Sequence, residues 1–412
     1  MSTQSASSTG LPGRVHAAIA AVIAFAAPST TLFAQNHCEY EVIAVHVPNQ
    51  PSTAIYLWDI ANTGWAGGRT SDFAGKPVTV SPSGQVSLLA SPPGGGEVNC
   101  ITDGGRVVGN TYPGHNTPVE WIDGVPVPFL ADFPISNGYA NAANDLGMTA
   151  GFVDGLPLPI AGACFWQDGV ALPLYETIAG IAWGMDDIGQ IAGWGQHPET
   201  LGFLGYVWHN GDFQWLPVPP DFTESVVRGM SSNGIVCGTS TLDDLATGNA
   251  TIWINRVAID CGRPVGYRRS RAFGVNALGQ VVGECEPLGG SGLPIFQFFW
   301  QNGEMVPIFT LQSSPFSGTL VHAGGINDRG EICGAGVDAN GKGCGIILRP
   351  IRSRSGDVTI DCRVDMRDIA ALFEFWGKEY IYDGGPGDLD GDRVVGPRDL
   401  AMVLADWDTE GR

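Results

Sequence analysis

Residues 274–283, GVNALGQVVG, decide the fold, because this stretch returns along the chain at nearly regular intervals. Its polar Asn-to-Gly turn suits the positive φ of a tight reversal, and the apolar residues after it suit a short β-strand. Stretches of the same pattern are CITDGGRVVG (100–109), NAANDLGMTAG (141–151), GMDDIGQIAG (184–193), GMSSNGIVCG (229–238) and GINDRGEICG (325–334). Recurrence of this kind indicates a fold assembled from similar units.

The units also share their spacing and an aromatic position. The turn glycines lie 42, 42, 45, 45 and 51 residues apart: Gly105, Gly147, Gly189, Gly234, Gly279 and Gly330. A tryptophan follows each of the first five turns, in VEWIDG (Trp121), CFWQDG (Trp166), YVWHNG (Trp208), TIWINR (Trp253) and FFWQNG (Trp300). Residues 346–348 fill that place in the last unit. Because these tryptophans recur at one structural position, we expect them in the core.

Each unit contains about four short strands and turns, which is typical of one propeller blade. A single sheet cannot bury both faces, whereas similar sheets stacked around an axis can. We therefore expect an all-β domain over residues 35–350, folded as a β-propeller of six or seven blades. A pair of β-sandwiches or an open β-solenoid is the alternative.

The two ends of the repeat region depart from the pattern. YLWDIANTG, which contains Trp58, looks like an earlier unit whose first strand is residues 40–45. Residues 77–90, PVTVSPSGQVSLLA, look like an extra hairpin within that unit. The last unit lacks its final strands, so N-terminal strands are expected to close the ring with it.

The repeated motif carries a resemblance to a known family. The pattern G-[IVM]-N-x-x-G-x-[VI]-[VC]-G followed by F-W-x-x-G resembles the HAF family of bacterial extracellular repeats, over most of residues 95–350. The His-Ala-Phe triplet of that family is absent, and QFF, ACF and GYV stand in its place. The resemblance implies export and a repeat fold, and it implies no particular reaction.

Composition and the N-terminus limit the possible functions. The formal net charge of −21 argues against nucleic acid as a partner, because phosphate binding needs a basic surface. Residues 1–34 are typical of an export signal: Arg14 and His16 precede the apolar run 17–27, and Ala34 is a suitable last residue. An organelle transit peptide is the alternative. Later residues contain no membrane span, so a secreted or periplasmic location is expected.

Other residues give weaker signals. Nine cysteines in an exported chain make disulfides possible, and Cys333 and Cys344 flank a hairpin across which they could pair. Cys237 and Cys333 share a repeat position where small apolar residues are expected to be buried. Arg263, Arg268, Arg269 and Arg271 form a basic patch that is either a solvated loop or a site for an anionic ligand. The sequence has no G-x-S-x-G elbow, H-E-x-x-H or phosphate-binding glycine loop, which disfavours an enzyme.

Beyond a linker at residues 351–356, the composition changes. Residues 357–412 hold 14 acidic and 6 basic residues in two similar blocks, GDVTIDCRVDMRDIAALFEFWG and GDLDGDRVVGPRDLAMVLADWD. A twelve-residue loop with carboxylates at its first, third, fifth and twelfth positions can wrap one Ca²⁺, which takes six to eight oxygens. In the second block these residues are Asp388, Asp390, Asp392 and Asp399, with the carbonyl of Val394 at the seventh position. In the first block they are Asp357, Asp361 and Asp368, with Thr359 in place of the carboxylate at the third position, the Arg363 carbonyl at the seventh and Asp365 at the ninth. An amphipathic helix is expected after each loop.

This pair of loop–helix units resembles a dockerin type I module, an EF-hand-type fold. The sixth loop position, usually Gly, is Cys362 in one loop and Arg393 in the other. The cohesin-recognition positions correspond to Met366–Arg367 and Pro397–Arg398, which differ from the Ser/Thr pair common in cellulosomal dockerins. The resemblance implies two Ca²⁺ ions and docking onto a cohesin-like or cell-surface protein through residues 357–412.

Two functions are compatible with these features. The first is a secreted, non-catalytic binding protein with a calcium-stabilised docking module, whose ligand could include carbohydrate. The second is a dockerin-bearing carbohydrate-active enzyme, or another component of extracellular polysaccharide degradation. Paired Asp or Glu residues in a recognisable setting are missing, although the carboxylates of a glycosidase need not be close in sequence.

Overall fold

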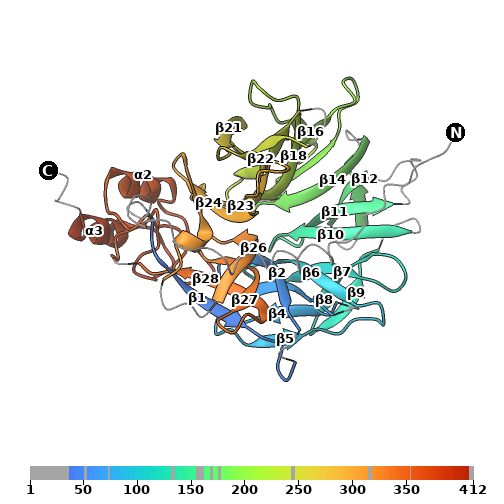
Figure 1. Cartoon of the computed structure of the whole chain (residues 1–412), viewed down its shortest axis with the longest axis horizontal. Helices are drawn as coiled ribbons and strands as arrows, with labels where there is room; N and C mark the ends of the chain where they lie inside the picture. The colour runs from blue at the N-terminus through green and yellow to red at the C-terminus, as the bar shows by residue number, and fades with distance from the viewer. Residues whose placement is uncertain are drawn as a thin grey trace.

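The chain forms a ring of antiparallel sheets with a small helical module beside it, as Figure 1 shows. The computed structural model describes residues 37–407, apart from 51–52, 73–74, 131–134, 155–161, 168–169, 175–177, 243–245, 314–317 and 353. The predicted export signal, residues 1–34, lies outside the described residues. Among those that are described, no helix is long and apolar enough to cross a membrane.

The ring contains seven four-stranded blades in the described part of the chain. Five sheets have four strands, and the eight-stranded sheet consists of two blades linked by one parallel pair, Gly248 with Arg269. In blades 1 to 3 the strands are β2 (Ile55–Ile60), β3 (Ala66–Thr70), β4 (Pro77–Val80), β5 (Val86–Leu88), β6 (Gly96–Ile101), β7 (Val107–Thr111), β8 (Thr117–Ile122), β9 (Val125–Pro128), β10 (Asn137–Ala143), β11 (Thr149–Asp154), β12 (Gly162–Gln167) and β13 (Val170–Pro173).

The remaining blades have the same order. In blades 4 to 7 the strands are β14 (Ile178–Met185), β15 (Ile191–Gln196), β16 (Phe203–His209), β17 (Asp212–Trp215), β18 (Glu224–Met230), β19 (Val236–Thr241), β20 (Gly248–Ile254), β21 (Val257–Gly262), β22 (Tyr267–Val275), β23 (Val281–Pro287), β24 (Phe296–Gln301), β25 (Glu304–Pro307), β26 (Gly318–Ile326), β27 (Ile332–Asp338), β28 (Gly343–Pro350) and β1 (Tyr40–Val45). A short 3₁₀ helix, η2 (Ile308–Thr310), follows β25.

The first strand of every blade lies at the centre of the ring. Contacts run from β2 to β6, β10, β14, β18, β22 and β26 in turn, and β26 contacts β2 again. The circle of inner strands is therefore closed, and the predicted β-propeller is confirmed with seven blades among the described residues.

The N-terminal strand completes the last blade. β1 pairs antiparallel with β28, from Tyr40 opposite Pro350 to Val45 opposite Gly345. The expected closure by an N-terminal strand is thus confirmed, whereas the assignment of residues 40–45 to the unit of Trp58 is wrong. Residues 77–90 are also no extra hairpin, because β4 and β5 are the third and fourth strands of blade 1.

The Asn of the repeated turn both closes the turn and joins two blades. In blade 6, Asn276 Oδ1 accepts hydrogen bonds from the backbone N–H of Leu278 (3.1 Å) and Gln280 (3.0 Å). Its Nδ2 donates to the carbonyl of Asn327 in the next blade (2.9 Å), and Asn327 donates in the same way to Ala61 of blade 1 (2.9 Å). A four-residue motif therefore supplies both local turn geometry and contacts around the ring.

The last Gly of the motif is required by a β-bulge in the inner strand. In blade 3, pairing shifts between Ala140 and Ala142, which pushes the backbone of Tyr139 toward Gly151. A Cβ on Gly151 would stand 1.8 Å from the Tyr139 carbonyl oxygen. The equivalent glycines of the other blades would meet an inner-strand carbonyl oxygen in the same way: Gly68, Gly109, Gly193, Gly238, Gly283 and Gly334.

Four of the five repeated tryptophans are buried as expected, whereas Trp208 is only partly buried and packs against the core of blades 3 and 4. Trp166 and Trp253 are each 1% exposed, and Trp121 and Trp300 are also buried. Cys237 and Cys333 are buried as small apolar residues, as expected. Cys333 and Cys344 are free cysteines, so the hairpin disulfide that their spacing allows is not formed. Instead Cys38 is bonded to Cys362, 324 residues away.

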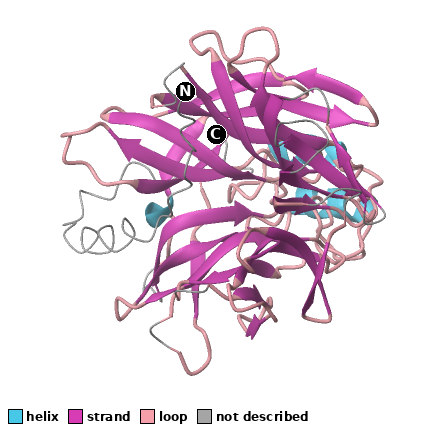
Figure 2. Ribbon diagram, turned by 90° about the vertical axis from the view of Figure 1, so that its right-hand side faces the viewer, coloured by secondary structure: helices cyan, strands magenta, loops and turns pink. Residues whose placement is uncertain are grey.

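The C-terminal module contains two helices, α2 (Met366–Glu374) and α3 (Pro397–Ala405), each following an acidic loop as predicted. Leu372 of α2 and Val403 of α3 are fully buried in a shared core, which also includes Ala277 from the turn of blade 6. Gln280 and Gln301 of blade 6 donate to the carbonyl of Thr359 (3.2 and 2.7 Å). Figure 2 shows the helices gathered at one side of the ring.

Candidate functional site

The second acidic loop brings three predicted metal ligands together. Carboxylate oxygens of Asp388, Asp390 and Asp392 lie within 4.8 Å of one another. Asp399 is buried and accepts from the backbone N–H of Leu389 and Gly396 (2.7 Å each), which folds the loop back onto α3. Three gathered carboxylates repel one another, so the donor set fits a hard cation with oxygen ligands such as Ca²⁺.

The first loop has the corresponding residues at the same positions, but its side chains are arranged differently. Asp357 and Asp368 are fully buried, and Asp368 Oδ1 accepts from the N–H and hydroxyl of Thr359 (2.9 and 3.1 Å). Asp361 accepts from the N–H of Arg363 (3.0 Å), and Asp365 caps α2 by accepting from the N–H of Arg367 (2.7 Å). No group of three carboxylates forms in this loop among the described residues, because Thr359 replaces one and the disulfide of Cys38 and Cys362 lies beside Asp357.

Both loops keep the left-handed turn that usually calls for Gly. Cys362 has φ 63° and Arg393 has φ 73°, a region that a side chain makes unfavourable. The departure from Gly therefore changes the residue and leaves the backbone path in place. In the second loop the Arg398 guanidinium lies 3.9 Å from Asp390 and 3.8 Å from Asp392, and its side chain is 79% exposed.

A second candidate site is the cavity along the axis of the propeller, of about 2290 Å³. The β-bulge of each inner strand places one residue at the same level of its wall. These residues differ from blade to blade: Trp58, Asn99, Asn141, Trp183, Arg228, Phe273 and Gly324. The bulge recurs in every blade, whereas the side chain that it places on the cavity wall differs from blade to blade.

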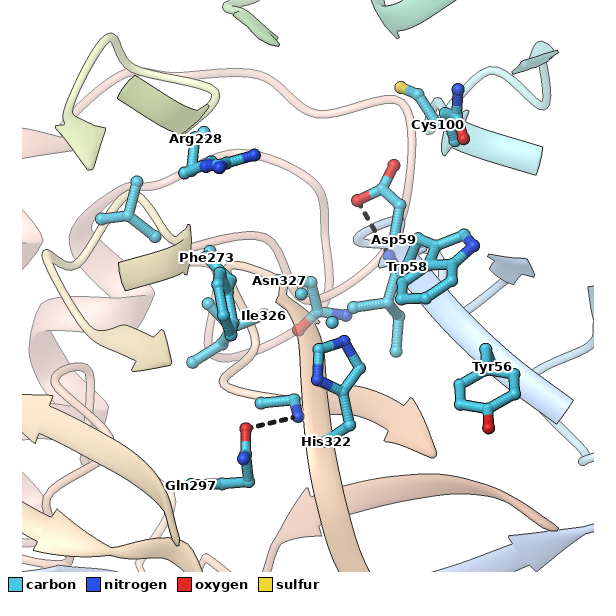
Figure 3. A pocket seen from close by; sticks show the side chains of 18 of the residues that line it. Tyr56, Trp58, Asp59, Cys100, Arg228, Phe273, Gln297, His322, Ile326 and Asn327 are labelled. Atoms are coloured by element: carbon cyan, nitrogen blue, oxygen red, sulfur yellow. Dashed lines mark hydrogen bonds between the residues drawn. The ribbon is translucent and has the colours of Figure 1, made fainter. Parts of the chain in front are cut away.

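Aromatic rings gather on one side of this cavity, as Figure 3 shows. Trp58 stacks on Tyr56 with ring centres 5.8 Å apart, and the His322 ring meets its edge at 5.5 Å. His322 also contacts Phe273 (5.6 Å), and burial lowers the pKa of His322. The imidazole of His322 therefore lies between two aromatic side chains from different blades.

The arginine patch lies in a strand and is largely neutralised. Arg268, Arg269 and Arg271 belong to β22 and line the cavity, so the solvated-loop interpretation is wrong for them. Arg268 and Arg269 pair with Glu286, and Arg271 pairs with Glu284. These hydrogen-bonded arginines lower the pKa of Glu286 against the opposing effect of burial.

Arg228, which sequence analysis did not single out, is different. Its guanidinium lies over the ring of Trp183, 5.1 Å from the ring centre. Among the described residues, no carboxylate lies within ion-pair distance of it. Burial lowers the pKa of Arg228, and the charges of Arg271 and Arg269 lower it further against the opposing charge of Glu284. By solvent-accessible surface the Arg228 side chain is exposed, because it faces the cavity.

At the turn end of the inner strands, the cavity is acidic. The second turn residue of every blade except blade 6 lines this end, and four of these six residues are Asp103, Asp145, Asp187 and Asp328. Asp328 accepts from Asn62, Ser232 and the backbone N–H of Ala277 (3.0, 2.7 and 2.7 Å). Burial raises the pKa of Asp103 to about 7 and that of Asp187 to about 6.

The C-terminal module covers this acidic end. Lys378 lies 3.7 Å from Asp187, and the pKa of Tyr382 is raised by burial and then by the charges of Asp328, Asp103 and Asp187. Those aspartates come from blades 7, 2 and 4, so the charges that act on Tyr382 belong to three different parts of the ring. Backbone bonds tie the covering segment to the second loop, from Tyr380 N–H to Arg393 O (2.9 Å) and from Val395 N–H to Lys378 O (3.1 Å).

Comparisons with known proteins bear on the fold alone. No family model and no curated protein matches the chain. The structure is similar to a TolB-type protein from Agrobacterium tumefaciens, with 10% identity, a TM-score of 0.43 and coverage of 73% of this chain and 99% of that one. It is also similar to the β-propeller domain of the trilobed protease from Pyrococcus furiosus (11%, TM-score 0.37, 62% and 95% covered). A gluconolactonase from Xanthomonas campestris is similar with 11% identity and a TM-score of 0.39, over 77% of this chain and 91% of that one.

Proposed function

We propose that the chain is an exported, non-catalytic binding protein, in which a propeller is held by a calcium-stabilised docking module of the dockerin type. The observation that carries this proposal is the group formed by Asp388, Asp390 and Asp392. Calcium would be bound by these carboxylates, the Val394 carbonyl and Asp399. The first loop, with Asp357, Thr359, Asp361, Arg363, Asp365 and Asp368 at the corresponding positions, would bind a second ion more weakly.

Export is supported by the disulfide as well as by residues 1–34. Cys38 and Cys362 form a bond that persists in an oxidising compartment and is rare in the cytosol. Cys38 also lies just after the predicted cleavage site at Ala34. The mature protein would therefore acquire this bond outside the cytoplasm.

A docking surface is available on the module. On α2, Met366 and Phe373 are 66% and 54% exposed, and Trp376, which follows the helix, contacts Phe373 with ring centres 5.3 Å apart. Large apolar side chains exposed together favour a protein partner. A cohesin-like or cell-surface protein would cover this face, while Leu372 holds the other face of α2 in the module core.

One observation favours the second candidate, a carbohydrate-active enzyme. Asp59 lines the cavity, and burial raises the pKa of its carboxyl group. A buried carboxyl with a raised pKa is the kind of group that general acid catalysis requires. Against this, both oxygens of Asp59 accept backbone N–H groups, from Ile60 and Ile101 (2.9 Å each). Release of reducing sugar from plant or algal polysaccharides, abolished in Asp59→Asn, would establish the enzyme.

Calcium titration of the full chain, by calorimetry and thermal unfolding, tests the proposal. The full chain is used because the module packs on blade 6 and is disulfide-bonded to Cys38. We expect calcium to bind and to raise the unfolding temperature, and Asp390→Asn with Asp392→Asn to abolish the tighter site. Glu374→Gln, on the exposed face of α2, is the matched control and should bind as the wild type does. Absence of both heat and thermal shift would overturn the calcium module.

A further inference from the structure

Among the described residues Arg228 has no carboxylate within ion-pair distance, whereas the neighbouring arginines of the cavity wall each have one. Arg268, Arg269 and Arg271 have Glu284 and Glu286 as partners. Arg228 projects from the bulge of β18 with only the Trp183 ring beneath it. A guanidinium that is exposed to a cavity and has no ion-pair partner is free to take a bidentate carboxylate or sulfate. The wall therefore presents a position for one acidic group.

The surfaces around Arg228 suit the body of a sugar. Trp58, Trp183 and Phe273 stand at the same level on blades 1, 4 and 6 and are each only partly buried. Such aromatic faces can stack on apolar ring faces. Between them, Asn99 and Asn141 donate to the carbonyls of Ala140 and Ala182 (2.9 Å each). Their own side-chain carbonyls accept no hydrogen bond from the described residues, which leaves acceptors for hydroxyl groups.

We propose that the central cavity binds a short acidic oligosaccharide. A carboxylate or sulfate of this ligand pairs with Arg228, and its sugar rings stack on Trp58, Trp183 and Phe273 (Figure 3 shows Arg228, Trp58 and Phe273). This inference rests on the proposed binding function and names the ligand class of the propeller. The cavity, at about 2290 Å³, exceeds the roughly 300–1,000 Å³ of ordinary small-molecule pockets, so several sugar units fit.

The two ends of the cavity differ in charge, which would orient an acidic ligand. Asp103, Asp187 and Asp328 make the turn end acidic, and the segment with Lys378 and Tyr382 lies over that end. An acidic group is repelled there and attracted toward the Arg228 level. The same acidic end and the net charge of −21 disfavour a densely charged polyanion such as a nucleic acid.

The test is calorimetric titration of the calcium-loaded full chain with three probes of matched length: trigalacturonate, a sulfated trigalactoside and cellotriose. We expect one of the two acidic probes to bind at least about tenfold more tightly than cellotriose. Which of them binds identifies carboxylate or sulfate as the group recognised. Arg228→Gln should weaken that binding at least about tenfold, and Arg256→Gln, on an exposed turn away from the axis, should leave it unchanged.

A second variant and a parallel measurement keep the outcome clear. If Arg228→Gln does not fold, Arg228→Lys keeps the charge without the planar fork and should still weaken binding of the acidic probe; unchanged binding would overturn the role of Arg228. Equal binding of cellotriose, or no binding of either acidic probe, would overturn the inference. If calcium still binds the same preparation, the docking proposal stands while the cavity inference falls; if calcium fails as well, both fall.

Discussion

The disulfide between Cys38 and Cys362 joins the segment before the first strand to the first acidic loop, with Cα atoms 5.1 Å apart. β1, which begins at Tyr40, is the outermost strand of blade 7. One bond therefore fastens both the strand that closes the ring and the module that covers its acidic end. Neither a repeat pattern nor local spacing predicts such a bond across 324 residues.

Loss of this disulfide should destabilise ring closure and the module together. We expect Cys38→Ala to lower the free energy of unfolding by about 2–5 kcal/mol, because the cross-link restricts the unfolded chain. Thermal unfolding with and without a reductant measures it. The reductant should lower the wild-type midpoint and leave Cys38→Ala unmoved. An equal shift in both proteins would show that the bond does not provide this stability.

The left-handed φ of Cys362 gives a further prediction for variants in which the disulfide cannot form. Because the residue has φ 63°, we expect Cys38→Ala/Cys362→Gly to be more stable than Cys38→Ala/Cys362→Ala. The difference should be about 1 kcal/mol, set by the cost of a Cβ in this region. Denaturant unfolding of the two double variants decides it. Greater stability of the alanine variant would contradict the assigned backbone conformation.

The motif glycines make a sharper packing prediction. Gly151→Ala would place a Cβ 1.8 Å from the Tyr139 carbonyl oxygen, so the bulge of blade 3 must shift. We expect a loss of at least about 1–3 kcal/mol, as for other overpacked sites. Gly289→Ala is the control, because no atom lies within 4 Å of the added Cβ and its φ is ordinary. Chemical denaturation should show a lower free energy of unfolding for Gly151→Ala than for Gly289→Ala. Similar stability of the two variants would contradict the close approach of the bulge to Gly151.

The bulges also explain how far sequence analysis reached. The Asn–Gly turns and the recurring tryptophan sufficed for the propeller, because both act through local conformation and a repeated core position. Trp58 was placed wrongly, since an aromatic in an inner strand resembles one in the third strand when only spacing is compared. Arg228 and Trp183 gave no signal, because their role depends on a register shift and on neighbours from other blades.

The blade-to-blade contact of Asn327 should be essential to the ring. Its Nδ2 donates to Ala61 O and to Glu331 Oε2 (2.9 and 2.7 Å). Asn327→Asp replaces this buried donor by a carboxylate facing two acceptors, so we expect a loss of about 2–4 kcal/mol at neutral pH. Asn210→Asp, in an exposed turn with φ 50°, is the matched control. Equal unfolding midpoints for Asn327→Asp and Asn210→Asp would show that the contact between blades 7 and 1 does not contribute this stability.

Asp103 predicts a pH dependence of stability. Its pKa in the folded chain is raised from 3.8 to about 7, chiefly by burial, and it faces Asn62, Asp328 and Asp187. Because the folded state holds the proton more tightly, this group favours folding below its unfolded pKa. That contribution is lost as the pH rises through about 7.

Replacement by a neutral isostere should remove this dependence. We expect Asp103→Asn to gain thermal stability relative to the wild type as the pH is raised from about 5 to about 8. The amide can still accept one hydrogen bond from Asn62. Asp123→Asn is the control, since Asp123 is exposed and other blades carry Asn at that turn position, as at Asn210 and Asn302. A constant difference between Asp103→Asn and wild type across this pH range would show that the Asp103 carboxyl is ionised throughout.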